Sequence, residues 1–518
     1  MKKRFTFLLA SAALTASAQT QYLDSSFHQN GLQDSLIASF TPQSSGLAKA
    51  VAIQSDGKIL LALEMQNKMN LMRLNADGTK DGSFATGGLF QESPSSVGST
   101  TSMDVVVQPD GKILFLGKTY FSSQVDDIVL YRLLPNGTPD NSFGTNGQVI
   151  TSAPGNNSYD VGNEILLRPN GKIVVVGSTN TRSSDDKHLL IQYKADGTLD
   201  AGFGTGGIAV RAPAGKAVFG KGGLLQPDGK VVVYGAQYQG NGSVGIIARY
   251  DTSGNADAGF GSAGYHEEKV HNNQATSVKT AALQSNGSMV LSLYAIPDTM
   301  HAVRITNSGN RDLTFGNNGI TAIKAGGFSD WGFLEKIMVL PGDSLLFGAN
   351  AVVNSSDQYD FTALRLTPAG IVDSSWGTNG KIVADFHHDY DNLYDIALQT
   401  DGKIVACGSS RQNNGTSYGY PSIARFKMVS RTAPAGVTVP GLPTDILGFY
   451  PNPTNGIVHL EGIQTGDRIA VWNALGQLVI QQTVTASFLD LKNLPQGLYH
   501  VQVVRQEAVI GQGRLLKE

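Results

Sequence analysis

The sequence predicts an all-β fold, with a seven-bladed β-propeller closed by its N-terminal strand and a small C-terminal β-sandwich behind it. Gly is abundant, at 61 of 518 residues, whereas charged residues make up only 16%. This composition is typical of short strands joined by tight turns. Short apolar runs recur along the chain without sustained helical periodicity. Turn markers repeat at separations of 54 to 61 residues, about 58 on average, which indicates one repeated structural unit.

The first 18 residues are expected to form a secretory signal peptide. Positive residues 2–4 precede a mostly apolar run over 5–14 that is too short to span a bilayer. Ala16-Ser17-Ala18 then supplies the small residues of a cleavage site before Gln19. A buried N-terminal helix is the alternative interpretation. We expect export through the periplasm to the cell surface or the extracellular space.

Composition also limits the partners of the chain. The mature balance is 36 Lys and Arg against 42 Asp and Glu once three positive residues leave with the signal peptide. Such a charge gives no reason to expect nucleic acid or an anionic membrane as a partner. No later stretch has the length of a transmembrane segment. Cys407 is the only cysteine, so an intrachain disulfide is excluded, and its apolar strand predicts a buried side chain rather than a nucleophile.

Two markers of the repeated unit each occur seven times, and a third occurs six times. The first is a hairpin turn in which Gly tolerates a positive φ, at Asp56-Gly57, Asp110-Gly111, Asn170-Gly171, Asp228-Gly229, Asn286-Gly287, Asp401-Gly402 and, in degenerate form, Gly342-Asp343. The second is an aromatic residue four positions before a Gly, at Phe27, Phe84, Phe143, Phe203, Phe260, Phe315 and Trp376. The third is a turn between them, at Gly78, Gly137, Gly197, Gly254, Gly309 and Gly370.

The unit over residues 102–160 illustrates the expected strands. They are Met103–Gln108, Ile113–Gly117, Ile128–Leu134 and Gln148–Ser152, separated by turns and one polar loop. Continuous apolar runs within them fit sheets that are covered on both faces. Four-stranded sheets stacked around a closed ring cover one another in this way and leave no long exposed edge.

The two ends of the repeat region explain the unequal counts. Residues 22–31 carry only the end of a unit, with Asp24 and Phe27, whereas residues 393–427 carry only the first three strands of one. The N-terminal segment therefore supplies what the last unit lacks, which predicts a closed ring over residues 22–427. An open array or two smaller rings are the alternatives, but a linear array needs polar capping units, and none is visible.

An Arg and an Asp recur at fixed positions of the units. The Arg lies on the third strand, at Arg73, Arg132, Arg249, Arg304, Arg365 and Arg425, with Gln192 in the third unit. The Asp lies three residues before the aromatic marker, at Asp24, Asp81, Asp140, Asp200, Asp257, Asp312 and Asp373. One interpretation is a ring of guanidinium groups that binds a polyanion. We favour the other, a charge-assisted pair that orients the turn of each unit, and we expect Arg425 to pair with Asp24 and fasten the ring.

The order of these elements is most regular over residues 127–147, which read Asp-Ile-Val-Leu-Tyr-Arg-Leu-Leu-Pro-Asn-Gly-Thr-Pro-Asp-Asn-Ser-Phe-Gly-Thr-Asn-Gly. This segment resembles the consensus of the delta-60 repeat family. The resemblance covers residues 22–427 and departs from the pattern at Gly342-Asp343-Ser344. It implies a propeller, and it leaves function open because it brings no catalytic motif.

Three motifs mark the C-terminal part, with residues Tyr450, Pro451, Asn452, Pro453 and Gly456, then Gly476, then Pro495, Gly497 and Tyr499. In order and spacing they resemble the type A sorting domain of the type IX secretion system of Bacteroidota. The resemblance implies that residues 444–518 are recognised by the secretion machinery, and that cleavage occurs in or near a linker over 428–443. An ordinary binding sandwich is the alternative. The expected strands of the sorting domain are Val458–Leu460, Ile469–Trp472, Leu478–Ile480 and Tyr499–Val504, which form a small β-sandwich.

Few residues indicate chemistry. His and acidic residues cluster over 385–391, where they could hold a transition metal. Adjacent strand residues point to opposite faces, however, so His387 and His388 do not readily share an ion. Residues 183–188 are more simply a solvated loop. No phosphate loop, zinc ligand pair, nucleophile elbow or EF-hand pattern occurs, so no catalytic residue, cofactor or metal is assigned.

Two classes of function remain. One is a secreted or surface-attached binding or scaffolding protein that uses loops at one end of the ring, such as 238–241 and 411–420, to contact a glycan or a protein. The other is a polysaccharide hydrolase or lyase whose acids converge near the channel mouth. The fold alone supports neither. Binding is favoured because no pair of non-repeating acids stands out.

Overall fold

The computed structural model divides the chain into two compact units, residues 1–430 and 431–518, and each is described by itself. The residues described are 22–28, 31–33, 46–92, 99–120, 126–154, 158–180, 185–240, 242–270, 276–295, 300–323, 332–352, 359–386, 389–411, 419–428, 449–450, 454, 456–460, 463–473, 478–485, 488–505 and 508–517. The expected signal peptide and residues 429–443 of the expected linker lie outside them. Among the described residues, no helix is long and apolar enough to cross a membrane.

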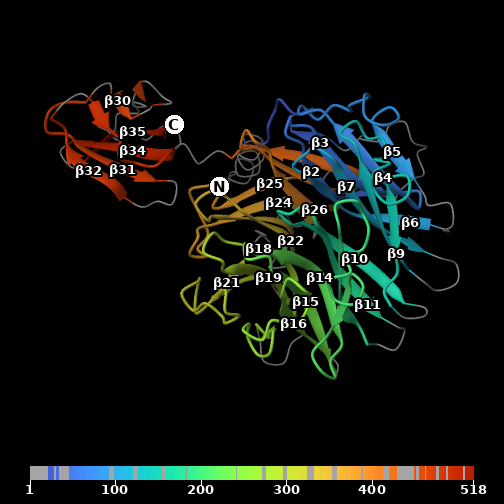
Figure 1. The fold of residues 1–518 in the computed structure, drawn as a ribbon. Coiled ribbons are helices and arrows are strands. Elements are labelled where there is room, and N and C mark those ends of the chain that lie inside the picture. The colour runs from blue at the N-terminus through green and yellow to red at the C-terminus, as the bar shows by residue number, and fades with distance from the viewer. Residues whose placement is uncertain are drawn as a thin grey trace, which may run out of the picture. The chain divides into compact units, whose positions relative to one another are not determined.

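The first unit is a β-propeller of seven four-stranded antiparallel sheets, as the sequence predicts (Figure 1). Blade 1 consists of β2 (Gly46–Ile53), β3 (Ile59–Met65), β4 (Lys68–Leu74) and β5 (Leu89–Glu92); blade 2 of β6 (Ser99–Val107), β7 (Ile113–Tyr120), β8 (Ile128–Leu133) and β9 (Gln148–Thr151); blade 3 of β10 (Tyr159–Leu167), β11 (Ile173–Asn180), β12 (Lys187–Tyr193) and β13 (Ile208–Arg211). Blade 4 consists of β14 (Val218–Leu225), β15 (Val231–Gln239), β16 (Gly242–Tyr250) and β17 (Tyr265–Glu268); blade 5 of β18 (Thr276–Leu283), β19 (Met289–Ala295), β20 (Met300–Ile305) and β21 (Ile320–Ile323); blade 6 of β22 (Gly332–Val339), β23 (Leu345–Val352), β24 (Tyr359–Leu366) and β25 (Lys381–Ala384).

Blade 7 is assembled from both ends of the propeller sequence. It combines β26 (Asp391–Leu398), β27 (Ile404–Arg411) and β28 (Gly419–Phe426) with the N-terminal strand β1 (Leu32–Gln33). Leu32 pairs with Ala424 in β28, and the backbone N–H of Lys427 donates to the carbonyl of Tyr22 at 2.8 Å. The N-terminal segment therefore closes the ring, as predicted.

Six of the seven aromatic markers pack against a glycine of the next blade. Phe84 of blade 1 is fully buried, and a Cβ added at Gly137 of blade 2 would lie 2.7 Å from its ring. Gly137 has a φ of 87°, so its turn and the neighbouring ring both require glycine. The same contact joins Phe27 to Gly78, Phe143 to Gly197, Phe203 to Gly254, Phe260 to Gly309 and Phe315 to Gly370. The third marker, which occurs six times in the sequence, is thus the glycine against which the aromatic ring of the preceding blade packs.

The first strand of every blade carries a β-bulge, which holds one extra residue. In blade 1, Ala48 pairs with Leu63 and Ala50 with Ala62, so that Lys49 is the extra residue. The first strands of neighbouring blades contact one another, as expected for strands that surround the central channel. Since a bulge redirects side chains, these positions decide what faces the channel.

The second unit is the predicted β-sandwich. One sheet contains β29 (Phe449–Tyr450), β30 (Ile457–Leu460) and β33 (Phe488–Asp490). The other contains β32 (Leu478–Thr483), β31 (Arg468–Asn473), β34 (Gly497–Arg505) and β35 (Ala508–Lys517). Apolar residues of both sheets, including Val458, Ile469, Leu489 and Val501, form one core. The sequence did not indicate β35, because Gly511 and Gly513 interrupt its apolar pattern.

Candidate functional site

The two ends of the propeller differ in what they carry. The turns between the first and second strands and between the third and fourth strands lie at one end, here called the turn face. The loops between the second and third strands, and those that lead to the next blade, lie at the other end, here called the loop face. Each sheet is antiparallel, and in blades 1 to 6 the strands follow sequence order, so this separation holds there. In blade 7 the N-terminal strand β1 takes the place of the fourth strand.

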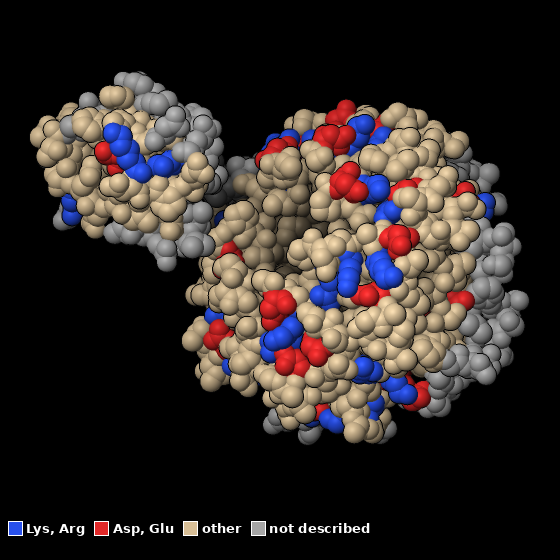
Figure 2. Space-filling model, viewed as in Figure 1, with Lys and Arg blue, Asp and Glu red and all other residues tan. Residues whose placement is uncertain are grey.

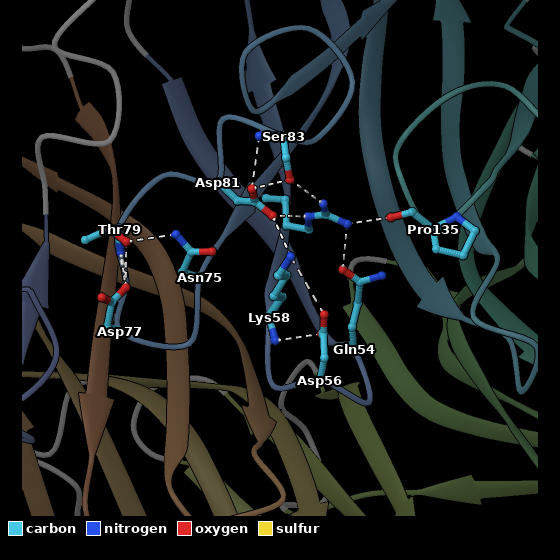
Figure 3. Close-up of polar contacts among 10 residues, drawn as sticks. Gln54, Asp56, Lys58, Asn75, Asp77, Thr79, Asp81, Ser83 and Pro135 are labelled. Carbon is cyan, nitrogen blue, oxygen red and sulfur yellow. Dashed lines mark hydrogen bonds and ion pairs between the residues drawn. The ribbon is translucent and has the colours of Figure 1, made fainter.

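The turn face carries a repeated polar cluster, shown for blade 1 in Figure 3. The Nε of Arg73 donates to Oδ2 of Asp81 at 2.8 Å, and Nζ of Lys58 lies 3.0 Å from the same oxygen. Ser83 donates its hydroxyl to the other carboxylate oxygen at 2.6 Å. The guanidinium also lies 4.6 Å from the centroid of the Phe84 ring, a cation–π distance. The Asp81 carboxylate therefore connects Lys58 of the first turn with Arg73 of the third strand.

The same Arg–Asp pair occurs in six blades. Beside Arg73–Asp81, the structure brings together Arg132–Asp140, Arg249–Asp257, Arg304–Asp312, Arg365–Asp373 and Arg425–Asp24, each with a 2.8 Å contact. These Arg side chains are 4% to 13% exposed. Buried guanidinium groups held by carboxylates are not presented to a polyanion. The geometry thus supports the structural interpretation of the repeat.

In blade 3 a Gln and an Arg from different positions replace the Arg that binds the Asp in the other blades. Gln192 replaces the Arg and donates to Asp200 at 2.6 Å, and Arg168, before the first turn, donates from Nε to the Gln192 side chain at 2.6 Å. In blade 1 the position of Arg168 is held by Gln54, which contacts Arg73. Arg and Gln have therefore exchanged places in blade 3. The repeat pattern of the third strand does not reveal Arg168, because Arg168 lies before the first turn.

The bulges define two layers of positions on the first strands, which surround the central channel. The layer nearer the loop face consists of Lys49, Met103, Asn163, Lys221, Lys279, Glu335 and Tyr394. The next layer consists of Ala50, Asp104, Glu164, Gly222, Thr280, Lys336 and Asp395. Three lysines and one glutamate make the first layer net positive, whereas three acids and one lysine make the second net negative. Desolvation within the channel lowers the pKa of Lys221, and the charge of Lys279 adds to this effect.

The acids of the second layer are bound to the backbone of the next blade. Oδ2 of Asp104 accepts the N–H of Ile165 at 2.8 Å, and Oε2 of Glu164 accepts the N–H of Gly223 at 2.8 Å. Asp395 accepts the N–H of Val51 at 3.0 Å. Desolvation raises the pKa of Asp104 to about 7. These acids, which the sequence did not single out, each connect two blades.

An aromatic row crosses the loop face over blades 5 to 7. Tyr294, Phe333, Tyr359 and Tyr390 follow one another with ring centroids 5.3, 5.8 and 6.1 Å apart. All four side chains are half-buried, and their planes are inclined by 34° to 57° between neighbours. Basic groups accompany the row: Lys279 Nζ lies 5.6 Å from the Phe333 centroid, and the Arg411 guanidinium lies 5.2 Å from the Tyr390 centroid.

A pocket of about 310 Å³ continues the row between blades 7 and 1. Its lining includes Glu64, Asn67, Asn392, Tyr394 and Arg411. Amide, aromatic and charged groups thus converge there, as in many sites that bind small polar ligands.

Figure 2 shows Lys and Arg beside Asp and Glu over the visible face of the propeller, without a large patch of one sign.

The loops named from the sequence are only partly described. Tyr238 is 51% exposed on the loop face, whereas Asn241 and residues 412–418 lie outside the described residues, as do His387 and His388. The expectation of a solvated loop over 183–188 is wrong at its end. His188 lies in β12, is fully buried and contacts the Tyr250 hydroxyl at 2.8 Å, and desolvation lowers its pKa to about 3.

The sorting motif is described in part. The Tyr499 hydroxyl donates to the Pro495 carbonyl at 2.7 Å, and the Gly456 N–H donates to the Thr454 hydroxyl at 3.1 Å. Gly497 begins β34, and Tyr450 lies in β29. The remaining motif residues, Pro451, Asn452, Pro453 and Gly476, lie outside the described residues.

Comparison with known families separates the two units in the same way. The profile of a domain of unknown function, the DUF5122 beta-propeller, matches residues 54–84, 108–143, 168–203 and 226–260. The profile of a secretion system C-terminal sorting domain matches residues 448–514. The chain carries DUF5122 propeller repeats and a secretion sorting domain. The sorting domain indicates delivery to the cell surface or the extracellular space and implies an interaction with the secretion machinery.

Solved structures resemble the DUF5122 propeller in fold alone. A virginiamycin B lyase from Staphylococcus aureus is 14% identical, with a TM-score of 0.43, over 75% of this chain and 97% of that one. A protein of unknown function from Dyadobacter fermentans is 13% identical, with a TM-score of 0.42, over 75% and 96%. The polysaccharide lyase Uly1 is 11% identical, with a TM-score of 0.44, over 79% and 94%. No curated protein matches the sequence.

Proposed function

We propose that the protein is a secreted, surface-associated propeller that binds an anionic polysaccharide on its loop face. A signal peptide directs the chain to the periplasm, and the type IX secretion system recognises the sorting domain and carries the propeller across the outer membrane. The turn face is occupied by its own repeated ion pairs. The loop face, where the blades differ from one another, is left to bind a ligand.

The aromatic row carries this proposal. Aromatic rings offer flat apolar surfaces to the apolar faces of sugar rings, and Tyr adds a hydroxyl that can hydrogen-bond a sugar. The centroid spacings of 5.3 to 6.1 Å are close to the length of one pyranose unit. Successive sugars of one chain can therefore contact Tyr294, Phe333, Tyr359 and Tyr390 in turn.

The charges beside the row favour a ligand with carboxylate or sulfate groups. Lys279 and Arg411 flank the row, and Lys49 lies 5.1 Å from the ring centroid of Tyr394 in the adjoining pocket. Lys49 is also 3.6 Å from Glu64, but that pair is 33% and 45% exposed, so it contributes little stability and can exchange partners. We expect affinity to fall as salt rises, because exposed charges are screened.

A second candidate, a polysaccharide hydrolase or lyase, rests on Asp104. Its pKa of about 7 suits a general acid or base. The backbone contacts of Asp104 and Glu164 favour a structural role for both. Turnover of a polysaccharide that is abolished by Asp104→Asn in the folded protein would establish the enzyme instead.

A glycan array with the secreted full chain tests the binding proposal, followed by titration of the best ligand. Tyr359→Ala and Phe333→Ala should each weaken binding about tenfold, a loss of about 1.4 kcal/mol. Tyr120→Ala is the matched control, because Tyr120 is a tyrosine at the loop-face end of β7 in blade 2, 41% exposed and outside the row. Binding that resists both row substitutions, or an array without any ligand, contradicts the proposal.

A further inference from the structure

Three carboxylates meet between blades 6 and 7 at the loop face. Asp360 is the second residue of β24, Asp385 follows β25, and Asp391 begins β26. One carboxylate oxygen of each lies within 4.8 Å of the other two. Asp360 and Asp391 are fully buried. This group is separate from the repeated ion pairs of the turn face.

Three oxygens of the two buried aspartates lack hydrogen-bond donors among the described residues. Both oxygens of Asp360 and Oδ1 of Asp391 have no partner among the described residues. Oδ2 of Asp391 accepts the N–H of Phe386 at 2.8 Å. A buried carboxylate without partners is costly unless a cation or a proton neutralises it. Burial raises the pKa of Asp360 to about 8, with the charge of Asp385 adding to the shift.

The junction between blades 2 and 3 has aspartates at two of the three equivalent positions and no acid at the third. There Asp127 and Asp160 occupy the two aspartate positions. The Ser152 hydroxyl donates to Asp127 at 2.6 Å, and the Thr179 hydroxyl donates to Asp160 at 2.6 Å. The N–H of Ala153 donates to the other oxygen of Asp160. Two buried aspartates are thus satisfied by hydroxyl groups.

Strand register makes the two junctions equivalent. The residue pairs that correspond are Ile128–Thr151 with Phe361–Ala384 and Asp160–Thr179 with Asp391–Ser410. Asp385 therefore stands at the position of Ser152, and Ser410 at that of Thr179. The Ser410 hydroxyl contacts the Ser422 hydroxyl at 2.6 Å rather than Asp391. Compared with the blade 2–3 junction, the carboxylate of Asp385 replaces one hydroxyl donor, and the other hydroxyl, that of Ser410, does not contact Asp391.

We propose that Asp360, Asp385 and Asp391 bind a divalent cation, Ca²⁺, which joins blade 6 to blade 7. Ca²⁺ takes six to eight oxygen ligands at 2.3 to 2.6 Å, so ligands of one ion lie at most about 5 Å apart. The 4.8 Å limit on the three oxygens meets this condition. Carboxylate oxygens supply the negative charge that a hard cation prefers, and water completes the coordination.

Calorimetry and thermal unfolding of the full chain, stripped with EDTA, test the proposal with CaCl₂, MgCl₂ and ZnCl₂ as probes. We expect one Ca²⁺ per chain and a Tm that rises with CaCl₂ concentration, because a ligand of the folded state stabilises it. MgCl₂ should bind more weakly. No Ca²⁺ binding, or ZnCl₂ binding at this junction in its place, overturns the proposal.

Variants connect the binding to these residues. Asp385→Ser restores the hydroxyl of the blade 2–3 junction, so it should abolish the Ca²⁺ response while its Tm in EDTA equals or exceeds that of the wild type. Asp385→Asn, which adds an amide donor, should behave likewise if the Ser variant does not fold. Asp127→Asn at the other junction should keep one Ca²⁺ per chain. Wild-type Ca²⁺ affinity in both Asp385 variants overturns the proposal.

Discussion

Asp24 and Arg425, from the two ends of the propeller sequence, form an ion pair of 2.8 Å in which the side chains are 5% and 4% exposed. Lys403 lies 3.1 Å from the same carboxylate oxygen. The N–H of Asp24 also donates to the Arg425 carbonyl at 2.9 Å. The junction that closes the ring therefore uses the same cluster as blades 1, 2 and 4, with its acid supplied by a distant segment.

Replacing this acid should destabilise the ring. Asp24→Asn leaves the buried Arg425 without its carboxylate, and loss of one partner of a buried pair costs about 3 kcal/mol. Asp312→Asn is the control, because its Arg304 partner is more exposed and lies within one continuous blade. Urea unfolding monitored by tryptophan fluorescence measures both. Equal losses of unfolding free energy in the two variants would contradict a special role in closure.

Acid should weaken the propeller through these aspartates. Burial alone disfavours ionisation of Asp24, but hydrogen bonds from Ser26 and Lys403 and the charge of Arg425 outweigh it and lower the pKa to about 2. A depressed folded pKa contributes stability above the unfolded value near 4, and that stability is lost as the pH falls toward 2. For Asp24 alone the loss is about 2 kcal/mol. Tm measured from pH 6 to pH 2 should fall, and more shallowly in Asp24→Asn.

The exchange of Arg and Gln in blade 3 predicts that substitutions at positions 168 and 192 compensate for each other. Arg168→Gln alone and Gln192→Arg alone should each destabilise the protein by about 1 to 3 kcal/mol, because each breaks a buried charge-assisted contact. The double variant recreates the arrangement of blade 1 and should recover most of the loss. A double-mutant cycle from urea unfolding measures this coupling, and simple additivity of the two losses would show that the residues act independently.

The C-terminal unit should be needed for secretion but dispensable for folding of the propeller. Deletion of residues 444–518 leaves every propeller strand intact, so we expect a folded protein retained in the periplasm. Cell fractionation and the Tm of the retained protein provide the two readouts. Asp467→Asn, which removes the 2.7 Å contact with Arg505 inside the sandwich, should destabilise that unit and leave the Tm of the propeller unchanged. Normal release of the deletion variant would refute the sorting assignment.

The fold could be predicted because its signals are local. Gly57 and Gly137 mark turns by their own backbone requirements, with φ of 83° and 87°, and repetition of such turns gives the blades. Closure of the ring could be predicted because the last unit, residues 393–427, lacks the third turn and the aromatic segment, and residues 22–31 supply that aromatic segment. The ion pairs followed from spacing alone. The role of Arg168 could not be predicted in this way, because Arg168 follows the first strand whereas Gln192, the residue it contacts, lies on the third.

The candidate sites depend on register and bulges, which the sequence does not display. Tyr294, Phe333, Tyr359 and Tyr390 are ordinary strand-end aromatics until the ring aligns them. The acidic run near Asp385 is visible in the sequence, but its partner Asp360 lies on the preceding strand of the same blade, 25 residues earlier. Only the pairing of β24 with β25 brings the two carboxylates together.

The contact between Phe84 and Gly137 is directional, since one unit contributes the ring and the next contributes the space for it. A unit copied whole carries both halves of this contact. Gene duplication could therefore lengthen such an array without any new interface having to evolve, and the number of units would be limited only by the curvature at which the first and last of them meet.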